Sequence, residues 1–248
     1  MSRAVAWAAL LLLSACGAGD VPAVSDAASV NAYVFRPGSP DGIGKFYMGR
    51  EIAHVMGHLG AGWLERDSRV AEERTDLLLD NLPMEPDDVV VDLGAGTGYF
   101  TLPMAARVPE GRVLAVDIQP EMLAIVRERV AAAGIRNVET VLATEIDPRL
   151  PRDSVDLVLL VDAYHEFSYP REVMLKVAAA LRPGGKVVLI EYRGEDPAVP
   201  IKELHKMTQQ QARRELAAAG LAWVETRDIL PQQHFMVFAK AAPPSSAS

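Results

Sequence analysis

A cluster of ionisable side chains follows one apolar run of the sequence, in the segment VDAYHEF, residues 161–167. We expect His165 to act as a general base, because an unperturbed imidazole titrates near neutral pH. Tyr164 and Glu166 flank this histidine and are the other candidate catalytic groups. The alternative is that Tyr164 and His165 only line a ligand pocket, because a reaction that mainly needs two partners held in line requires no base.

A glycine-rich loop lies upstream, in VVVDLGAGTGYF, residues 89–100, where an apolar run ends in Asp92. Three glycines follow at alternating positions, Gly94, Gly96 and Gly98. Glycines between a strand and a helix let backbone N–H groups approach a nucleotide-like cofactor. A dinucleotide fingerprint would space its glycines G-x-G-x-x-G and would place the third at Tyr99. The glycine spacing alone is weak evidence, and its position after a buried strand strengthens it.

Two acids indicate which cofactor this loop binds. The Asp92 carboxylate would repel a pyrophosphate at short range in a reduced dielectric. It suits a cofactor that carries an ammonium and a sulfonium, and S-adenosylmethionine is such a cofactor. Asp117 ends the next apolar run and is placed to accept hydrogen bonds from ribose hydroxyls, with Ile118 beside it to pack on an adenine. The alternative for Asp117 is a helix N-terminal acid that the helix dipole favours.

The elements that would position these residues alternate regularly along the chain. The runs that predict strands are Val89–Leu93, Val113–Val116, Val138–Leu142, Val155–Val161 and Lys186–Tyr192. Helices are predicted at 98–108, 120–133, 170–182 and 203–219, and the last precedes an antiparallel pair, Ala222–Thr226 and His234–Lys240. Near-continuous apolar strands are typical of a parallel sheet covered on both faces, whose carboxyl edge faces the ligand crevice. The sequence therefore predicts one doubly wound α/β domain.

Four motifs, in this order and spacing, resemble those of class I S-adenosylmethionine-dependent methyltransferases: VVVDLGAGTGYF, VLAVDIQPEML, DSVDLVLLVDAYHEF and LRPGGKVVLIEY. The resemblance covers about residues 70–240 and implies a seven-stranded, mostly parallel, Rossmann-like sheet with an antiparallel last strand. It also implies S-adenosyl-L-methionine as the cofactor and methyl transfer as the reaction. The fourth motif resembles the small-molecule type, including enzymes that methylate quinone rings.

The resemblance assigns cofactor-binding roles to residues at the ends of the first three predicted strands. They are Asp92, Gly94, Gly96 and Gly98 around the methionine moiety, Asp117 at the ribose, and Thr144 and Glu145 bordering the adenine. Asp162 is a further candidate near the methyl donor, because it lies at the carboxyl end of the fourth predicted strand. Family members often have an aspartate in the segment of Thr144 and Glu145, so this sequence departs slightly from the pattern there.

The N-terminal residues resemble a bacterial lipoprotein signal peptide. Arg3 precedes an apolar run, Ala4–Leu13, which is too short to span a bilayer as a helix, and the lipobox-like sequence Leu-Ser-Ala-Cys ends at Cys16. We therefore predict export, a lipid anchor at Cys16 and a location in the cell envelope. The alternatives are a buried helix with a chance cysteine and a cytoplasmic enzyme, which agrees better with the place where S-adenosylmethionine is made.

The predicted organisation has five segments. They are a signal peptide with lipobox at 1–16, a flexible tether at 17–44, an N-terminal helical cover at 45–82 with helices over Arg50–Leu64 and Val70–Leu82, the methyltransferase domain at 83–240, and a disordered tail at 241–248. His54 and His58 would be neighbours on the first helix. With His205 and His234 a divalent-metal site is conceivable, but no carboxylate stands in a ligand pattern beside them. We therefore predict no metal site and expect this helix to cover the substrate pocket.

Composition narrows the class of partner. The net charge of −8 argues against nucleic acid, because neutralising phosphates needs a basic face. Aromatic residues make up only 6%, which disfavours a stacking platform for single strands. A small-molecule acceptor is therefore expected, and no oligomeric state is predicted. Two other functions remain open: a nicotinamide-dependent oxidoreductase on a similar sheet, and a non-catalytic envelope protein that kept the cofactor-binding fold.

Overall fold

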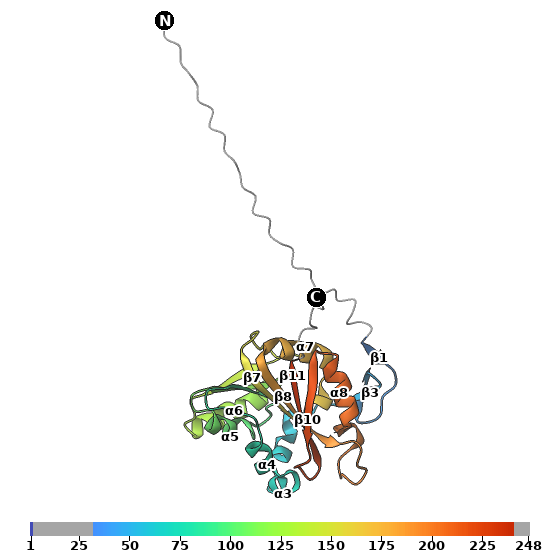
Figure 1. Cartoon of the computed structure of the whole chain (residues 1–248). Helices are drawn as coiled ribbons and strands as arrows, with labels where there is room; N and C mark the ends of the chain where they lie inside the picture. Colours follow the sequence, from blue (N-terminus) through green and yellow to red (C-terminus); the bar gives the residue numbers. More distant parts are fainter. Residues whose placement is uncertain (2–31, 241–248) are drawn as a thin grey trace.

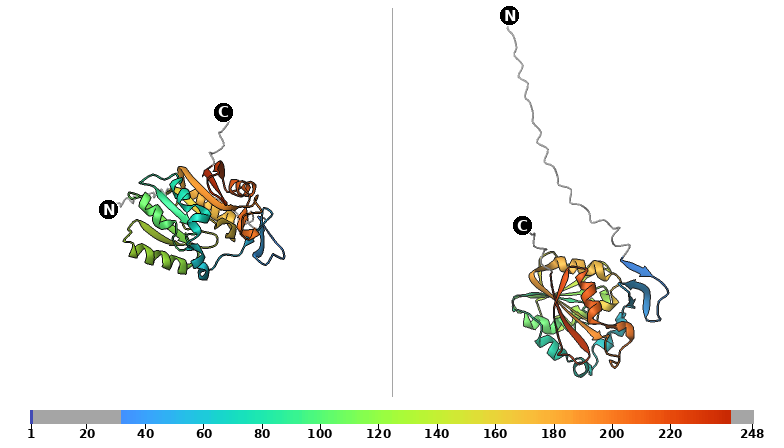
Figure 2. Two further views of the ribbon diagram at one scale, coloured as in Figure 1. Left: turned by 90° about the horizontal axis from the view of Figure 1, so that it is seen from below. Right: turned by 45° about the vertical axis from the view of Figure 1, so that its right-hand side comes forward.

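The structure is a computed structural model that describes residue 1 and residues 32–240 (Figure 1). The predicted signal peptide with Cys16, most of the predicted tether and the predicted tail at 241–248 lie outside the described residues. The described chain has a central sheet with helices on both faces, and a small N-terminal sheet lies beside α8 (Figures 1 and 2).

The central sheet has the strand order β10-β11-β8-β7-β4-β5-β6. The strands are β4 Val89–Leu93, β5 Arg112–Asp117, β6 Val138–Leu142, β7 Val155–Val161, β8 Leu181–Arg193, β10 Leu221–Arg227 and β11 Gln233–Lys240. Pairings from β6 to β8 are parallel, whereas β11 is antiparallel to both β8 and β10. A short strand, β9 (Lys206–Met207), also pairs with β8. Within the described residues, this confirms the predicted doubly wound sheet and adds β9 to its seven strands.

The residues of β4 explain why both faces of the sheet are covered. All of them are buried, and successive side chains point to opposite faces. Val91 packs in a cluster with residues of α7 and α8, and Val90 packs in a second cluster with residues of α4 and α5. The helices are α4 Thr75–Asp80, α5 Thr101–Arg107, α6 Pro120–Ala132, α7 Pro170–Ala180 and α8 Gln209–Ala217. These helices cover the two faces of the sheet, so the edge formed by the carboxyl ends of the parallel strands is the side that a ligand can approach.

The N-terminal cover differs from the prediction, because its first part is a β-sheet. Strands β1 (Tyr33–Phe35), β2 (Gly42–Tyr47) and β3 (Arg50–Ala53) pair antiparallel in that order. Met48 and Gly49 form the turn between β2 and β3 with φ of 48° and 91°, the left-handed conformation that a two-residue hairpin loop requires. The tether expected up to residue 44 and the helix expected over Arg50–Leu64 are therefore wrong.

The spacing of Ile52, Val55 and Leu59 explains that error, because it is the spacing of one stripe on a helix. The exposed fractions of Val55 and Leu59 are 48% and 93%, so these residues do not form a buried stripe with Ile52. Only short helical turns follow β3, namely η1 (His58–Gly60) and α2 (Ala61–Leu64). The next predicted helix, Val70–Leu82, is present as two pieces, α3 (Arg69–Glu73) and α4. Arg74 separates them, because its φ of 53° is left-handed and ends α3.

The chain before α8 also differs from the long helix predicted at 203–219. A turn of 3₁₀ helix, η3 (Glu203–His205), leads into β9, and α8 begins only at Gln209. The Thr208 hydroxyl accepts a hydrogen bond from the Gln211 N–H and caps this start. The interruption matters for the site, because it allows η3 to approach η2 (Tyr164–Glu166).

Candidate active site

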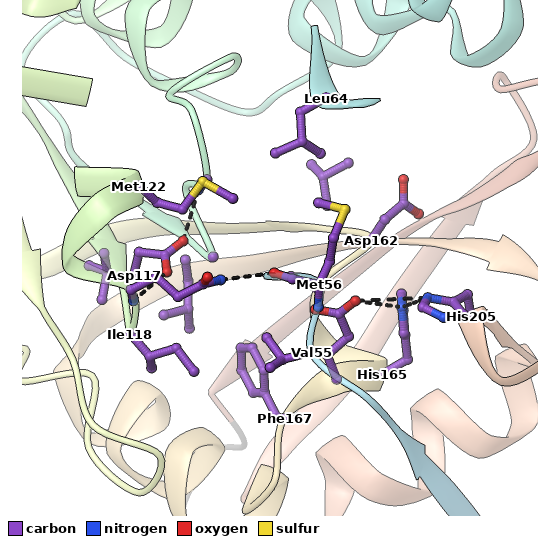
Figure 3. Close-up of a pocket in the computed structure, with 18 of the residues that line it drawn as sticks. Val55, Met56, Leu64, Asp117, Ile118, Met122, Asp162, His165, Phe167 and His205 are labelled. Atoms are coloured by element: carbon purple, nitrogen blue, oxygen red, sulfur yellow. Dashed lines mark hydrogen bonds and ion pairs between the residues drawn. The ribbon is translucent and has the colours of Figure 1, made fainter. Parts of the chain in front are cut away.

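One cavity of about 350 Å³ opens where β4, β5 and β7 end. Its volume lies in the range of small-molecule and cofactor sites. Figure 3 shows Asp117, Ile118 and Met122 at one end of it and His165 and His205 at the other. The predicted residues that line it are Gly94, Gly96, Asp117, Ile118, Thr144, Glu145, Asp162, His165 and Glu166. The topology thus brings together the ends of four strands that are far apart in sequence.

The glycine loop approaches the cavity without side chains. Gly94 and Gly96 have φ of 80° and 52°, and a Cβ at either position would lie 2.7 Å from Ala163 or Leu64. The N–H groups of Gly94 and Gly96 bond to Val116 and Asp117 inside the protein. The predicted donation of these N–H groups to a cofactor is therefore not what the structure shows: the glycines supply close approach instead. Gly98 packs against Leu102 and Val126 and is not among the described lining residues.

The Asp117 carboxylate lies at the centre of the cofactor end. Its Oδ2 accepts from the Gly96 N–H at 2.9 Å and its Oδ1 accepts from the Gln119 N–H at 2.8 Å. Each carboxylate oxygen has capacity for a further hydrogen bond from a ligand. Burial raises the pKa of Asp117. Ile118 next to it is partly exposed at the cavity mouth.

Asp92 occupies a different place from the one expected. Its carboxylate is buried beneath the loop, where Oδ2 accepts from the Thr101 hydroxyl at 2.5 Å. Asp92 is not among the described residues that line the cavity. Burial raises the pKa of Asp92 to about 6. Its position ties β4 to the start of α5, so direct contact with a cofactor ammonium is not supported.

Asp162 provides an acceptor that the protein leaves partly unused. It follows β7 with a left-handed φ of 49°, an uncommon conformation for a residue other than glycine. Its Oδ2 accepts from Gln233 Nε2 at 2.6 Å, whereas the buried Oδ1 has no hydrogen-bond partner among the described residues. Burial, followed by the charges of Glu73 and Glu191, raises the pKa of Asp162 well above its usual value. A cationic ligand group in the cavity would satisfy this oxygen.

His165 belongs to a buried polar network at the other end. Its Nδ1 lies 2.6 Å from Glu191 Oε2, and its Nε2 lies 3.0 Å from His205 Nδ1. Burial disfavours the imidazolium, but the charge and the hydrogen bond of Glu191, together with the charge of Glu166, outweigh burial and raise the pKa of His165. Burial and the charge of His165 lower the pKa of His205 to about 4. Glu166, whose pKa burial raises to about 6, faces both histidines.

Tyr164 points away from this network. Its side chain is fully buried, its ring lies 5.6 Å from that of Phe167, and it is not among the described residues that line the cavity. Neighbouring side chains of η2 point in different directions, so the Tyr164 side chain lies in the core while the His165 side chain faces the cavity. The predicted catalytic role of Tyr164 therefore needs correction, because this side chain does not reach a ligand there.

The segment from Val55 to His58 crosses the cavity and is held at two points. Gln119 Nε2 donates to the Met56 carbonyl at 2.9 Å, and Gln119 Oε1 accepts from the His58 N–H at 2.8 Å. On the other side, Glu166 Oε2 accepts from the Met56 N–H at 3.1 Å. The expected cover of the pocket is therefore present as an extended strap. His54 and His58 are not among the described residues that line the cavity, so the pair contributes no polar contact there.

Three residues of the site escaped the sequence analysis: Gln119, Glu191 and Met56. Gln119 follows Asp117 by two positions, and Glu191 lies near the carboxyl end of β8, where it is still paired with His234 of β11. A search for polar residues at the ends of all predicted parallel strands would have found both. Met56 was expected on a helix, so nothing in the sequence indicated that its backbone would contact Gln119. His205 was considered only together with His54, His58 and His234, and its place beside His165 was not foreseen.

The ionisable groups of the cavity suit a cationic cofactor. Acids around it are Glu73, Asp117, Glu145, Asp162 and Glu166. Arg69 and Arg66 also line it, but both are paired with Glu73 at 2.9 Å and 2.5 Å. A ligand with an ammonium and a sulfonium would meet unpaired carboxylate oxygens, whereas a pyrophosphate would meet like charge. The residues present therefore fit S-adenosylmethionine.

Comparisons with known proteins agree with this geometry. Residues 90–185 match a family model described as "Methyltransferase domain". An uncharacterized methyltransferase-like protein of Schizosaccharomyces pombe is 29% identical over 151 residues, which are 61% of this chain and 56% of that protein. A demethylmenaquinone methyltransferase of Symbiobacterium thermophilum is 33% identical over 108 residues, 43% of each protein. The matches thus span about half the length of these relatives.

A solved structure extends the likeness to about three quarters of the chain. The SAM-dependent methyltransferase of Aquifex aeolicus superposes with a TM-score of 0.69 at 20% identity, covering 74% of this chain and 98% of that one. At this identity the superposition establishes the fold. The family match over residues 90–185 contains the glycine loop, Asp117, Asp162 and His165. Residues 90–185 thus match the methyltransferase domain model, and the described chain shares the Rossmann-like fold of the methyltransferase structure.

Proposed function

We propose that this protein transfers a methyl group from S-adenosyl-L-methionine to a small organic acceptor bound in the cavity. The observation that carries the proposal is the arrangement of one cavity with two chemically different ends. Asp117 and the glycine loop form the cofactor end, and His165, Glu166 and His205 form the acceptor end. The methyltransferase domain match over residues 90–185 supports the same reaction.

At the cofactor end, Asp117 would accept hydrogen bonds from the ribose, and Ile118 with Thr144 and Glu145 would border the adenine. Gly94 and Gly96 would allow the methionine part close to the backbone, and Asp162 Oδ1 would face its positive charge. The cofactor supplies an electrophilic methyl group on a sulfonium. Methyl transfer is an in-line displacement, so most of what the protein contributes is orientation and exclusion of water.

At the acceptor end, the paired histidines provide a place for a proton. Glu191 holds the His165 ring and His205 lies against it, so a hydroxyl beside them can lose its proton as the methyl group is transferred. Val55, Met56 and Phe167 supply apolar wall between this end and the cofactor end (Figure 3). This combination favours a small, largely apolar acceptor with an acidic hydroxyl. One relative is named demethylmenaquinone methyltransferase, which supports a quinol-like ring.

The test of the cofactor is calorimetric titration of the full chain with S-adenosylmethionine, its demethylated product and NADH. We expect micromolar binding of the first two and none of NADH. Tight NADH binding without a response to the methyl donor would support the oxidoreductase alternative. Transfer of labelled methyl groups to a panel of quinols and phenols is the second step. Cofactor binding without transfer to any of them would support the non-catalytic alternative.

We also propose export and lipid anchoring at Cys16. The support is the basic residue, the apolar run Ala4–Leu13 and the lipobox-like sequence before Cys16. Among the described residues, no helix is long and apolar enough to cross a membrane. A lipid anchor would hold the cavity close to a membrane-borne acceptor.

The anchor is tested with a Cys16→Ser variant in a bacterium that processes lipoproteins. We expect the wild type in the membrane fraction and labelled by palmitate, and the variant unlabelled. If both proteins are soluble in the cytoplasm and retain Met1, the cytoplasmic alternative replaces this proposal.

A further inference from the structure

We propose that His165, Glu166 and His205 bind one divalent transition-metal ion, with Zn²⁺ as the probe, on the wall of the cavity. His165 Nε2 and His205 Nδ1 lie 3.0 Å apart, and Glu166 Oε1 lies 3.8 Å from each of these nitrogens. The three ligand atoms converge on one point from two separate segments, η2 and η3. Two imidazoles with one carboxylate form a ligand set of zinc and non-haem iron sites, which keep further positions open.

The distances distinguish this arrangement from a simple hydrogen bond between two histidines. Such a bond requires no third group, yet a largely buried carboxylate oxygen stands opposite both nitrogens at equal distance. At 3.8 Å, Glu166 Oε1 is too far to hydrogen-bond with either nitrogen. An ion between the three atoms would satisfy all of them at once.

Two of the three ligands are held by a contact on the side away from the proposed ion. The His165 Nδ1 pairs with Glu191 Oε2 at 2.6 Å, and Glu191 Oε1 accepts from the His165 backbone N–H at 3.3 Å. A carboxylate on the far nitrogen is the usual outer contact of a metal-binding histidine, because it fixes the tautomer and the ring orientation. Glu166 is fixed in the same way, since its Oε2 accepts from the Met56 N–H.

The surrounding charges also favour a cation. Glu166 and Glu191 bring two carboxylates to the histidine pair. The positive side chains beside the cluster are paired with carboxylates: Arg50, which also donates to the His165 carbonyl at 3.1 Å, pairs with Glu215 at 2.8 Å, and Lys202 pairs with Asp41 at 2.5 Å. Binding of the ion would release the proton shared between the two imidazoles.

All three ligands line the cavity, so the open positions of the ion would face a bound acceptor. There it would lower the pKa of an acceptor hydroxyl or thiol and replace the histidines as the activating group. This role rests on the proposed methyl transfer, whereas metal binding does not.

The experiment measures metal binding directly. The full chain is stripped with a chelator, and Zn²⁺ is titrated by calorimetry while Co²⁺ is followed by its visible absorption. We expect one ion per chain for the wild type and loss of that binding in His205→Gln and Glu166→Gln. Glu191→Gln should weaken binding about 10–100-fold, the effect of losing an outer contact. Because His205 is partly exposed, its replacement is compatible with folding, and a thermal melt of each stripped variant checks this.

Matched controls separate this site from other zinc ligands. His234→Gln removes a histidine that pairs with Glu195 at 2.7 Å outside the cluster, and Cys16→Ser removes the only thiol. Both should bind the ion like the wild type. Failure of the wild type to bind, or binding that survives both His205→Gln and Glu166→Gln, would overturn the proposal. Titration of the same stripped proteins with S-adenosylmethionine shows separately whether the cofactor end is intact.

Discussion

The Asp117 carboxylate and the Gly96 N–H are joined by a hydrogen bond of 2.9 Å, which links the end of β5 to the glycine loop. The acid therefore has two tasks: it holds the loop open and it faces the proposed ribose. We predict that Asp117→Ala weakens binding of S-adenosylmethionine by about 1–3 kcal/mol, the scale of a lost charge-assisted hydrogen bond. Calorimetry measures the change in the dissociation constant.

The control for Asp117 is Glu121→Ala, which removes an exposed acid from the first turn of α6. It should leave the affinity unchanged, because a distant surface charge is screened by salt. Equal affinities for the wild type and Asp117→Ala would place the cofactor outside this end of the cavity.

Asp92 predicts a pH dependence of stability whose sign follows from its pKa. Burial raises the pKa from 3.8 to about 6 in the folded protein. Between these values the folded protein keeps the proton that the unfolded chain releases, so the free energy of unfolding falls as pH rises from about 4 to about 6. Relative to Asp92→Asn, the wild type should lose about 3 kcal/mol across this window, since one pKa unit corresponds to about 1.4 kcal/mol.

Denaturant unfolding of the cofactor-free proteins at pH 4, 5, 6 and 7, about one unit apart across that window, measures this difference. Asparagine keeps an acceptor for the Thr101 hydroxyl, so the comparison isolates the charge. If the difference between the two proteins is constant with pH, Asp92 is ionised throughout and the buried neutral carboxyl is refuted.

The sheet could be predicted because the apolar runs of β4, β5, β7 and β8 are buried on both faces. That burial pattern leaves parallel pairing with covering helices as the solution. The N-terminal cover could not be predicted in the same way. Ile52 and Met56 have helical spacing, but the turn at Met48 and Gly49 and the pairing of Arg50 with Glu215 of α8 determine the strands. The ion pair joins residues that are 165 positions apart, and local periodicity carries no such information.

Site residues that lie at or just after the ends of strands could be predicted from the sequence. Site residues whose position depends on tertiary packing could not. Asp117 ends β5, and Asp162 and His165 follow the end of β7, so they met in one cavity as expected. Asp92 is the last residue but one of β4, but its side chain points under the loop to Thr101. His205 joins His165 only because η3 and β9 interrupt the long helix that its sequence suggested. Direction of a side chain and breaks in helices are set by tertiary contacts.

Breaking the ion pair between Arg50 and Glu215 is expected to lower the stability of the fold strongly. Glu215 is fully buried, and its two oxygens accept from Arg50 Nε and Nη2 at 2.8 Å each. Glu215→Ala leaves a buried guanidinium unpaired, so the free energy of unfolding should fall by about 3–5 kcal/mol. Thermal and denaturant unfolding measure the change. Arg74→Ala, which breaks the exposed pair with Asp76, is the control and should unfold like the wild type. A small effect of Glu215→Ala would mean that β3 is not anchored on α8.

The clamp between Gln119 and the strap predicts how the cavity is kept closed. The Gln119 amide bonds to both the Met56 carbonyl and the His58 N–H, whereas the opposite side of the strap depends on Glu166. We predict that Gln119→Ala speeds hydrogen exchange in residues 54–58, because the backbone there loses two hydrogen bonds. The affinity for S-adenosylmethionine should fall several-fold, because a more mobile strap loses more conformational entropy when it is ordered over the bound cofactor.

Hydrogen exchange with mass spectrometry measures the exchange rates of the strap amides and of the rest of the chain in one experiment. The control is Gln211→Ala, whose amide bonds Glu215 on α8 rather than the strap, and exchange in residues 54–58 should match the wild type there. The β4 amides should stay protected in every variant, since β4 lies in the centre of the sheet. Unchanged exchange in Gln119→Ala would show that apolar contacts of Val55 and Met56, and not the amide clamp, hold the strap over the cavity.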